Sequence, residues 1–169
     1  ALFLFSSITY EKISSSFDNS FDMANMAFFG ENLILDKICE KDICVGDVLK
    51  IGQAKVQITQ PRQPCWKLSA NSLKNSMTKF IFETGLTGFY AKVLKEGQIS
   101  QNDDVVLEQR TNPNLTIEKL NQIIVEPKID INLTKEALAC EDLGHQFKNS
   151  LTKRYELGDE DNQFSFYHT

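Results

Sequence analysis

Apolar and polar residues alternate along 54–59, where every second side chain is apolar. A period of two is typical of a strand with one buried face, so this segment is predicted to be a strand. It follows Gly52-Gln53, a two-residue connection of the Gly-x type that favours a hairpin with 47–51. Phe89–Leu94 and Val105–Glu108 are predicted to be two further strands. The middle of the chain is therefore expected to be β-rich.

A helical spacing replaces the alternation between residues 69 and 84. Apolar side chains at positions i, i+4, i+7 and i+8 share one face of a helix, and here they are Leu73, Met77, Phe80 and Ile81. Gly85 follows where a C-terminal cap belongs. Near the start of the chain, Ser6 or Ser7 is expected to cap a shorter helix that reaches Phe17.

From Asn114 onward the apolar residues are spaced for three helices. They are Ile117, Leu120, Ile123 and Ile124, then Leu133, Ala137 and Leu138, and then Leu143, Phe147, Leu151 and Tyr155. We therefore predict a mixed β and α chain, with a β domain over 1–110 and a small three-helix domain over 111–157. The tail, 158–169, is acidic and then aromatic, and it is expected to dock on the protein or on a partner.

The charge balance narrows the function classes. The 169 residues include 18 Lys and Arg against 23 Asp and Glu, a net charge of −5. This argues against nucleic acid polymers and anionic membrane surfaces as partners. The longest apolar run, Ala1–Phe5, is far shorter than the roughly 20 residues that span a bilayer, and no signal peptide is recognised. Because the sequence opens inside this apolar segment, we expect an upstream partner element to be missing.

The spacing of the cysteines and histidines argues against a disulfide framework, a zinc site and the common hydrolase motifs. The four cysteines are irregularly spaced, which favours reduced thiols and a cytoplasmic location. Cys39 and Cys44 have no second pair and no nearby histidine, so they do not match a zinc site. Cys140 is expected to pack among helices. His145 and His168 are the only histidines, and neither belongs to a Ser-His-Asp or His-Glu-x-x-His pattern.

The segment Gln60–Leu68 is the strongest candidate for chemistry. Its two prolines restrict the backbone, so the loop after the predicted strand should be stiff. Arg62 and Lys67 flank Cys65, and nearby cations favour the thiolate, which attacks electrophiles or binds a soft metal. The alternative is a small buried cysteine beside a buried Trp66, with no chemical role.

Two glycine-containing segments are weaker candidates. Gly30-Glu31-Asn32 offers a carboxylate and an amide at a turn before a strand expected at 33–35, and such groups bind polar ligands. Thr84–Gly88 contains two glycines that could let the backbone approach a phosphate or a pterin. It lacks the glycine spacing of dinucleotide-binding folds and the ending of a P-loop. Taken alone, both segments are also explained as simple turns.

Four segments, in this order, together resemble the MOSC domain, specifically its YiiM-like branch. They are Phe29–Leu33 (FGENL), Val45–Gly52 (VGDVLKIG), Gln60–Leu68 (QPRQPCWKL) and Thr84–Gly88 (TGLTG). The helical segment 114–156 also resembles the C-terminal helical domain of that branch. One departure is that the family's His-Gly-Gly segment, which precedes the position of Ala1, is absent from this sequence. This agrees with the expectation that an upstream part is missing.

The resemblance implies a β-barrel-like fold that binds the molybdenum cofactor, with the Cys65 thiolate as a ligand of molybdenum. It further implies that Gly30, Glu31 and Asn32 line the cofactor pocket. Other residues expected to bind the cofactor are Arg62, Lys67, Gly85 and Gly88. YiiM-like proteins are associated with the reduction of N-hydroxylated substrates such as hydroxylaminopurines, which implies a detoxifying oxidoreductase.

Three functions stay open at this stage. The first is a molybdenum-cofactor reductase of N-hydroxylated bases, amines or amidoximes. Because no flavin or NAD motif is visible, a separate flavoprotein reductase is expected to supply its electrons. The second is a sulfur carrier, in which Cys65 receives persulfide sulfur from a cysteine desulfurase. The third is a non-catalytic binding module whose helices and aromatic tail contact a partner protein.

Overall fold

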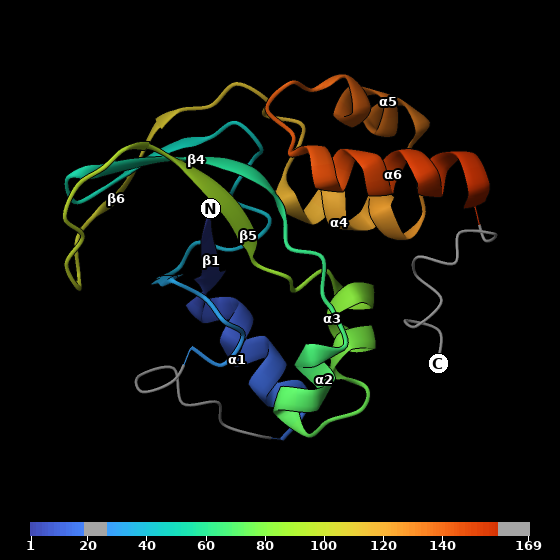
Figure 1. Ribbon diagram of the computed structural model, residues 1–169, viewed down its shortest axis with the longest axis horizontal. Coiled ribbons are helices and arrows are strands. Elements are labelled where there is room, and N and C mark those ends of the chain that lie inside the picture. The colour runs from blue at the N-terminus through green and yellow to red at the C-terminus, as the bar shows by residue number, and fades with distance from the viewer. Residues whose placement is uncertain (19–26, 159–169) are drawn as a thin grey trace.

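The computed structural model describes residues 1–18 and 27–158. Six strands form one sheet, and they are β1 (Leu2–Ser6), β2 (Leu33–Leu35), β3 (Val48–Ile51), β4 (Ala54–Pro61), β5 (Phe89–Lys95) and β6 (Val105–Gln109). Their order is β2-β1-β5-β4-β3-β6. Only the β1–β2 pair is parallel among these neighbours. The sheet curls into a half-barrel (Figure 1), which confirms the predicted β-barrel-like fold.

The predicted hairpin is confirmed as β3 and β4. Their register runs from Val48 opposite Gln57 to Ile51 opposite Ala54, and Gly52 at the turn has a φ of 55°. The apolar residues of β4 face the core, while Lys55 and Gln57 face outward. The strands predicted near residues 89 and 105 are also present as β5 and β6.

Three helices lie on the side of the sheet where β1 ends, at the bottom of Figure 1: α1 (Ser7–Ser16), α2 (Lys67–Ser72) and α3 (Met77–Thr84). The predicted capping serine is Ser6, whose hydroxyl accepts the backbone N–H of Ile8 at 3.2 Å. The predicted cap at Gly85 is confirmed, because its φ is 71° and its N–H donates to the Ile81 carbonyl.

The prediction of a single helix from 69 to 84 is wrong, because α2 ends at Ser72 and its C-cap is Leu73. This residue has a φ of 55° and is 88% exposed, so it does not share the buried face of α3. The hydroxyl of Ser69 accepts the Thr78 backbone N–H at 3.0 Å and donates to the Asn75 carbonyl at 3.0 Å. Such side-chain bonds compete with the helical ladder and turn the backbone between the two helices.

The three predicted C-terminal helices are present as α4 (Ile117–Val125), α5 (Ile131–Ala139) and α6 (His145–Leu157). They form a group at the upper right of Figure 1, beside the sheet. Thr116 caps α4 by accepting the Lys119 N–H at 3.2 Å, and Asp130 caps α5 by accepting the Leu133 N–H at 2.9 Å. The predicted aromatic tail lies outside the described residues.

Two apolar clusters hold these parts together. The larger one joins the sheet to the C-terminal helices and includes Leu49, Ile58, Leu120 and Phe147. The smaller one fills the space between β1 and the helices α1, α2 and α3, and it consists of Phe3, Phe5, Tyr10, Ile13, Phe29, Leu68, Met77 and Ile81. None of the helices within 1–18 and 27–158 is both long and apolar enough to span a membrane. The four cysteines are free thiols.

Candidate functional site

The loop after β4 presents Cys65 as a half-buried free thiol. Two hydrogen bonds fix the carbonyl of this residue: it accepts the Leu68 backbone N–H and the Thr78 hydroxyl, each at 3.0 Å. Trp66 is 67% exposed, so the alternative of a cysteine beside a buried tryptophan is wrong. The loop is therefore tied to α3 while its thiol stays accessible.

The two cations that flank Cys65 in sequence are placed differently. The backbone N–H of Arg62 donates to the Gly88 carbonyl at 3.1 Å, and its guanidinium lies 4.9 Å from the centre of the Phe3 ring. A cation over an aromatic face is attracted by the ring quadrupole, which orients the Arg62 side chain. Lys67 is exposed at the first residue of α2.

Phe3 on β1 links three of the predicted site residues. Its N–H donates to Oδ1 of Asn32 at 2.8 Å, and its carbonyl accepts the Asn32 N–H at 2.8 Å. Its ring lies below Arg62 and also limits the space at Gly88, because a Cβ there would lie 2.8 Å from a Phe3 ring carbon. Asn32, Arg62 and Gly88 thus converge on one aromatic residue.

Glu31 is buried beside the smaller apolar cluster, next to Tyr10 and Phe29. Its carboxylate accepts the hydroxyl of Tyr10 and, at 3.0 Å, the backbone N–H of Phe29. Burial raises the pKa of Tyr10 far above its ordinary value, and the neighbouring Glu31 carboxylate raises it further. Gly30, with a φ of 84°, is the turn residue that brings Glu31 back toward the core.

The segment Thr84–Gly88 is held from two sides. The amide nitrogen of Asn121 donates to the Gly85 carbonyl at 2.8 Å and to the Thr87 hydroxyl at 2.9 Å. The buried carboxylate of Glu40 accepts the Gly88 N–H at 2.9 Å and the Thr9 hydroxyl at 2.7 Å.

Burial also affects the pKa of the Glu40 carboxylate. It raises the pKa of Glu40, while the hydrogen bonds from Gly88 and Thr9 act in the opposite direction.

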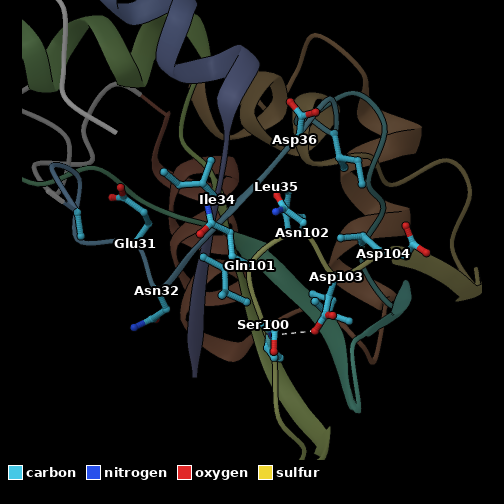
Figure 2. A pocket seen from close by; sticks show the side chains of 16 residues that line it. Glu31, Asn32, Ile34, Leu35, Asp36, Ser100, Gln101, Asn102, Asp103 and Asp104 are labelled. Atoms are coloured by element: carbon cyan, nitrogen blue, oxygen red, sulfur yellow. Dashed lines mark hydrogen bonds between the residues drawn. The ribbon is translucent and has the colours of Figure 1, made fainter. Parts of the chain in front are cut away.

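A groove of about 850 Å³ opens beside β2 (Figure 2). Glu31 and Asn32 line it, and so do three acidic residues: Asp36 directly after β2, and Asp103 and Asp104 just before β6. The other six predicted site residues, which are Gly30, Arg62, Cys65, Lys67, Gly85 and Gly88, are not among its lining residues. The structure therefore places Glu31 and Asn32 at this groove and Cys65 outside its lining.

Several residues of this arrangement were not predicted from the sequence. They are Phe3, Tyr10, Glu40, Thr78 and Asn121, and each contacts a predicted site residue or its segment. Their partners lie at least 13 positions away along the chain. No local spacing rule marks such contacts, because they arise only when the sheet and helices come together.

The curled sheet with a cysteine loop at the end of β4 defines a MOSC-type protein. Residues 1–106 match the MOSC domain, and the chain belongs to this family.

Among known sequences, the chain is similar to "Uncharacterized protein YflK" of Bacillus subtilis, with 33% identity over 76% of this chain and 58% of that protein. It is also similar to a protein named "Reductase" of Gibberella moniliformis, with 28% identity over 68% of this chain and 21% of that protein. The chain therefore corresponds to a little over half of the bacterial relative and to a small part of the fungal one.

Two solved structures share the fold over nearly the whole chain. YiiM from Geobacillus stearothermophilus superposes with a TM-score of 0.83 and 31% identity, covering 91% of this chain and 77% of that one. YiiM from Escherichia coli superposes with a TM-score of 0.84 and 25% identity, covering 98% of this chain and 82% of that one. Both comparisons confirm the resemblance to the YiiM-like branch.

Proposed function

We propose that this protein is an oxidoreductase that binds the molybdenum cofactor and reduces N-hydroxylated compounds such as hydroxylaminopurines, hydroxylamines or amidoximes. The observation that carries the proposal is the thiol of Cys65, which is free, half-buried and placed on a loop tied to both Gly88 and α3. A redox role agrees with the name of the fungal relative, "Reductase".

The residues around Cys65 suit such a cofactor. A thiolate is a soft ligand, and soft ligands are suited to transition metals bound by sulfur. The loop also contains a buried hydrogen-bond donor, Nε2 of Gln63, which has no partner among the described residues. The other side-chain atom, Oε1 of Gln63, accepts the Ser150 hydroxyl at 3.3 Å. A buried N–H without an acceptor costs on the order of 1–3 kcal/mol. An acceptor atom of a bound group would remove this cost.

The remaining predicted residues divide into two roles in this proposal. Arg62 and Lys67 would supply positive charge for the phosphate of the pterin. The Glu31 carboxylate, the Oδ1 and backbone N–H of Asn32, and backbone groups of the two glycine segments are already paired within the protein. We therefore assign these residues to shaping the site and not to direct contact with the cofactor.

Reduction of an N-hydroxylated amine to the amine consumes two electrons and two protons and releases one water. The cofactor would supply the redox-active metal, and Cys65 would supply its protein ligand. Because the sequence has no flavin- or NAD-binding motif, a separate flavoprotein reductase is proposed to supply the electrons. The four free thiols suit a reducing compartment, and we propose the cytoplasm.

The test is the metal and pterin content of the protein purified from a host that makes the cofactor. Wild type, Cys65→Ser and the control Cys140→Ser are compared, since Cys140 is a buried cysteine at the end of α5. We expect about one molybdenum per chain in wild type and in the control, and loss of molybdenum in Cys65→Ser. Reduction of an N-hydroxylated substrate with chemically reduced viologen as electron donor should follow the same order.

Two results would contradict the proposal. If the Cys65→Ser variant retained molybdenum in full, Cys65 would not be the ligand of the metal. No molybdenum in any variant, together with a mass increase of one sulfur atom on Cys65 after incubation with a cysteine desulfurase and cysteine, would favour the sulfur carrier instead. In that reaction the persulfide sulfur of the desulfurase is transferred to the Cys65 thiolate, and the desulfurase thiolate leaves.

A further inference from the structure

A single buried hydroxyl connects α3 to the residue that carries the reactive thiol. Thr78 is 5% exposed, and its Oγ1 donates to the Cys65 carbonyl at 3.0 Å across 13 positions of sequence. The same oxygen lies 2.8 Å from the Ser69 hydroxyl and accepts the Ser69 backbone N–H at 3.2 Å. Thr78 therefore joins the cysteine loop, the start of α2 and the start of α3.

This contact is not an ordinary helix cap. Thr78 is the second residue of α3, and the residue at the N-cap position, Ser76, makes no side-chain capping bond. A capping side chain accepts an N–H from the first turn of its own helix. The hydroxyl of Thr78 instead reaches out of α3 to the cysteine loop.

The helix that carries Thr78 is itself firmly placed. Met77 and Ile81 are buried in the smaller apolar cluster. At the other end of α3, Asn121 from α4 donates to the Gly85 carbonyl. Because both ends of α3 are held, the position of the Thr78 hydroxyl is fixed relative to the rest of the protein.

Elsewhere the loop is held to α6, where the Ser150 hydroxyl donates to Oε1 of Gln63 at 3.3 Å. The Cys65 carbonyl accepts one further hydrogen bond, from Leu68 three residues later, which belongs to the loop itself. On the other side, the Arg62 N–H donates to the Gly88 carbonyl. Thr78 thus supplies the tie between Cys65 and an element outside its own turn.

We propose that Thr78 is a positioning residue that sets the exposure and orientation of the Cys65 thiol. This inference rests on the proposed function only in that both assign the chemistry to Cys65. Its physical content is independent of any cofactor: without the Thr78 hydroxyl, the cysteine loop moves away from α3 and the thiol becomes more accessible.

The test is the rate at which iodoacetamide alkylates each cysteine of the folded, metal-free protein, followed by peptide mass spectrometry from pH 6 to 9. Thr78→Val keeps the side-chain shape and removes the hydroxyl. We expect it to raise the rate at Cys65 at least threefold at pH 7. Thr78→Ser, which keeps the hydroxyl, should restore the wild-type rate and the wild-type pH profile.

Two controls separate positioning from loss of structure. Thr84→Val removes from the same helix a hydroxyl that donates to the Phe80 carbonyl within α3, and it should leave the Cys65 rate unchanged. The buried Cys39, Cys44 and Cys140 report on general unfolding. If Thr78→Val does not fold, Ser69→Ala takes its place, because Ser69 orients the Thr78 hydroxyl.

An unchanged rate at Cys65 would overturn the inference. A parallel rise at all four cysteines would also overturn it, because the hydroxyl would then support only the fold as a whole. Since alkylation needs no metal, a protein that never binds molybdenum but shows the expected change at Cys65 would refute the proposed function and leave the role of Thr78 intact. Molybdenum binding together with an unchanged alkylation rate in Thr78→Val would refute the role of Thr78 and leave the proposed function intact.

Discussion

Asn32 and Phe3 are joined by two hydrogen bonds, each of 2.8 Å, although 29 positions separate them in sequence. The side chain of Asn32 accepts the Phe3 N–H, and the Asn32 N–H donates to the Phe3 carbonyl. An asparagine that bonds a neighbouring strand in this way extends the sheet by one residue beyond β2. The position of the Phe3 ring, and with it that of Arg62, therefore depends on Asn32.

Removing the Asn32 amide should destabilise the protein. Asn32→Ala leaves the partly buried Phe3 N–H without an acceptor, and an unmade bond of this kind costs about 1–3 kcal/mol. Urea unfolding should show a loss in this range. Asn149→Ala, at an exposed position of α6, is the control and should change the free energy of unfolding by less than about 0.5 kcal/mol. Equal effects at the two positions would contradict the prediction.

Alanine should be tolerated at Gly30 and not at Gly88. Both glycines have a positive φ, 84° and 68°, so each substitution costs about 1–2 kcal/mol of backbone strain. A Cβ at Gly30 meets no atom within 4 Å, whereas a Cβ at Gly88 would lie 2.5 Å from a Phe5 ring carbon and 2.7 Å from the Leu4 carbonyl. Thermal unfolding should show a much larger loss for Gly88→Ala, and similar losses would argue against this packing.

The ion pair of Asp47 and Arg110 should matter far more than that of Lys55 and Glu108. Asp47 is fully buried and accepts two guanidinium hydrogen bonds from Arg110, at 2.9 and 2.7 Å, and the Cys44 N–H at 2.8 Å.

Breaking such a buried pair costs about 3–5 kcal/mol. Arg110→Met is therefore expected to lower the free energy of unfolding by an amount approaching this range. The loss should stay below the full range because Arg110 itself is exposed. Lys55 and Glu108 form a pair of 2.6 Å that is about one third exposed, so Lys55→Met should cost about 0–1 kcal/mol. Denaturant titrations of both variants measure the difference, and equal losses would refute the contrast.

Glu40 should make the protein less stable as the pH rises. Its pKa is raised above the ordinary value of 4.5 because burial penalises the charged form. A group whose pKa is raised in the folded state stabilises fully below its unfolded pKa, and this contribution is lost as the pH rises through the folded pKa. Glu40→Gln keeps a neutral side chain of the same size at all pH values.

The measurement is the difference in free energy of unfolding between Glu40→Gln and wild type, taken by urea unfolding from pH 4 to pH 8. The difference should move in favour of Glu40→Gln as the pH rises above about 4.5. A difference that stays constant across this range would show that burial does not shift the titration of Glu40.

The parts of the fold that were predictable from the sequence depend on neighbouring residues. The β3–β4 hairpin follows from the alternation around Val56 and the Gly52 turn, and the cap at Gly85 follows from the residue's own conformational freedom. The three C-terminal helices follow from their apolar spacing. In the hairpin and in the helices, the stabilising contacts repeat at a fixed short interval, which makes the pattern visible along the chain.

The break at Leu73 was not predictable from the same spacing. The apolar residues around it fit one helix face, but the hydroxyls of Ser69 and Thr78 bond each other's backbone and direct the chain into a turn. The exposure of Trp66 was equally hidden, because tryptophan is usually packed against other residues. The break at Leu73 thus arises where specific polar contacts override an apolar pattern.

The candidate site was predictable only in part. The sequence singled out Cys65 and its stiff loop, and the structure places an accessible thiol there. It could not show that Glu31 lines a groove while Arg62 lies over Phe3, because these relations link distant segments. Tertiary packing alone determines which members of a motif come together.

The larger apolar cluster contains side chains from the sheet and from α4, α5 and α6 alike. Amide protons of β4 and of α6 should therefore exchange with deuterium through the same global opening, with matching free energies and matching responses to denaturant. A protease cut between 110 and 116 would leave two fragments that remain associated under native conditions, and separating them would expose Leu120 and Ile58 to water. We therefore expect the C-terminal helices to unfold together with the sheet and not as a separate unit.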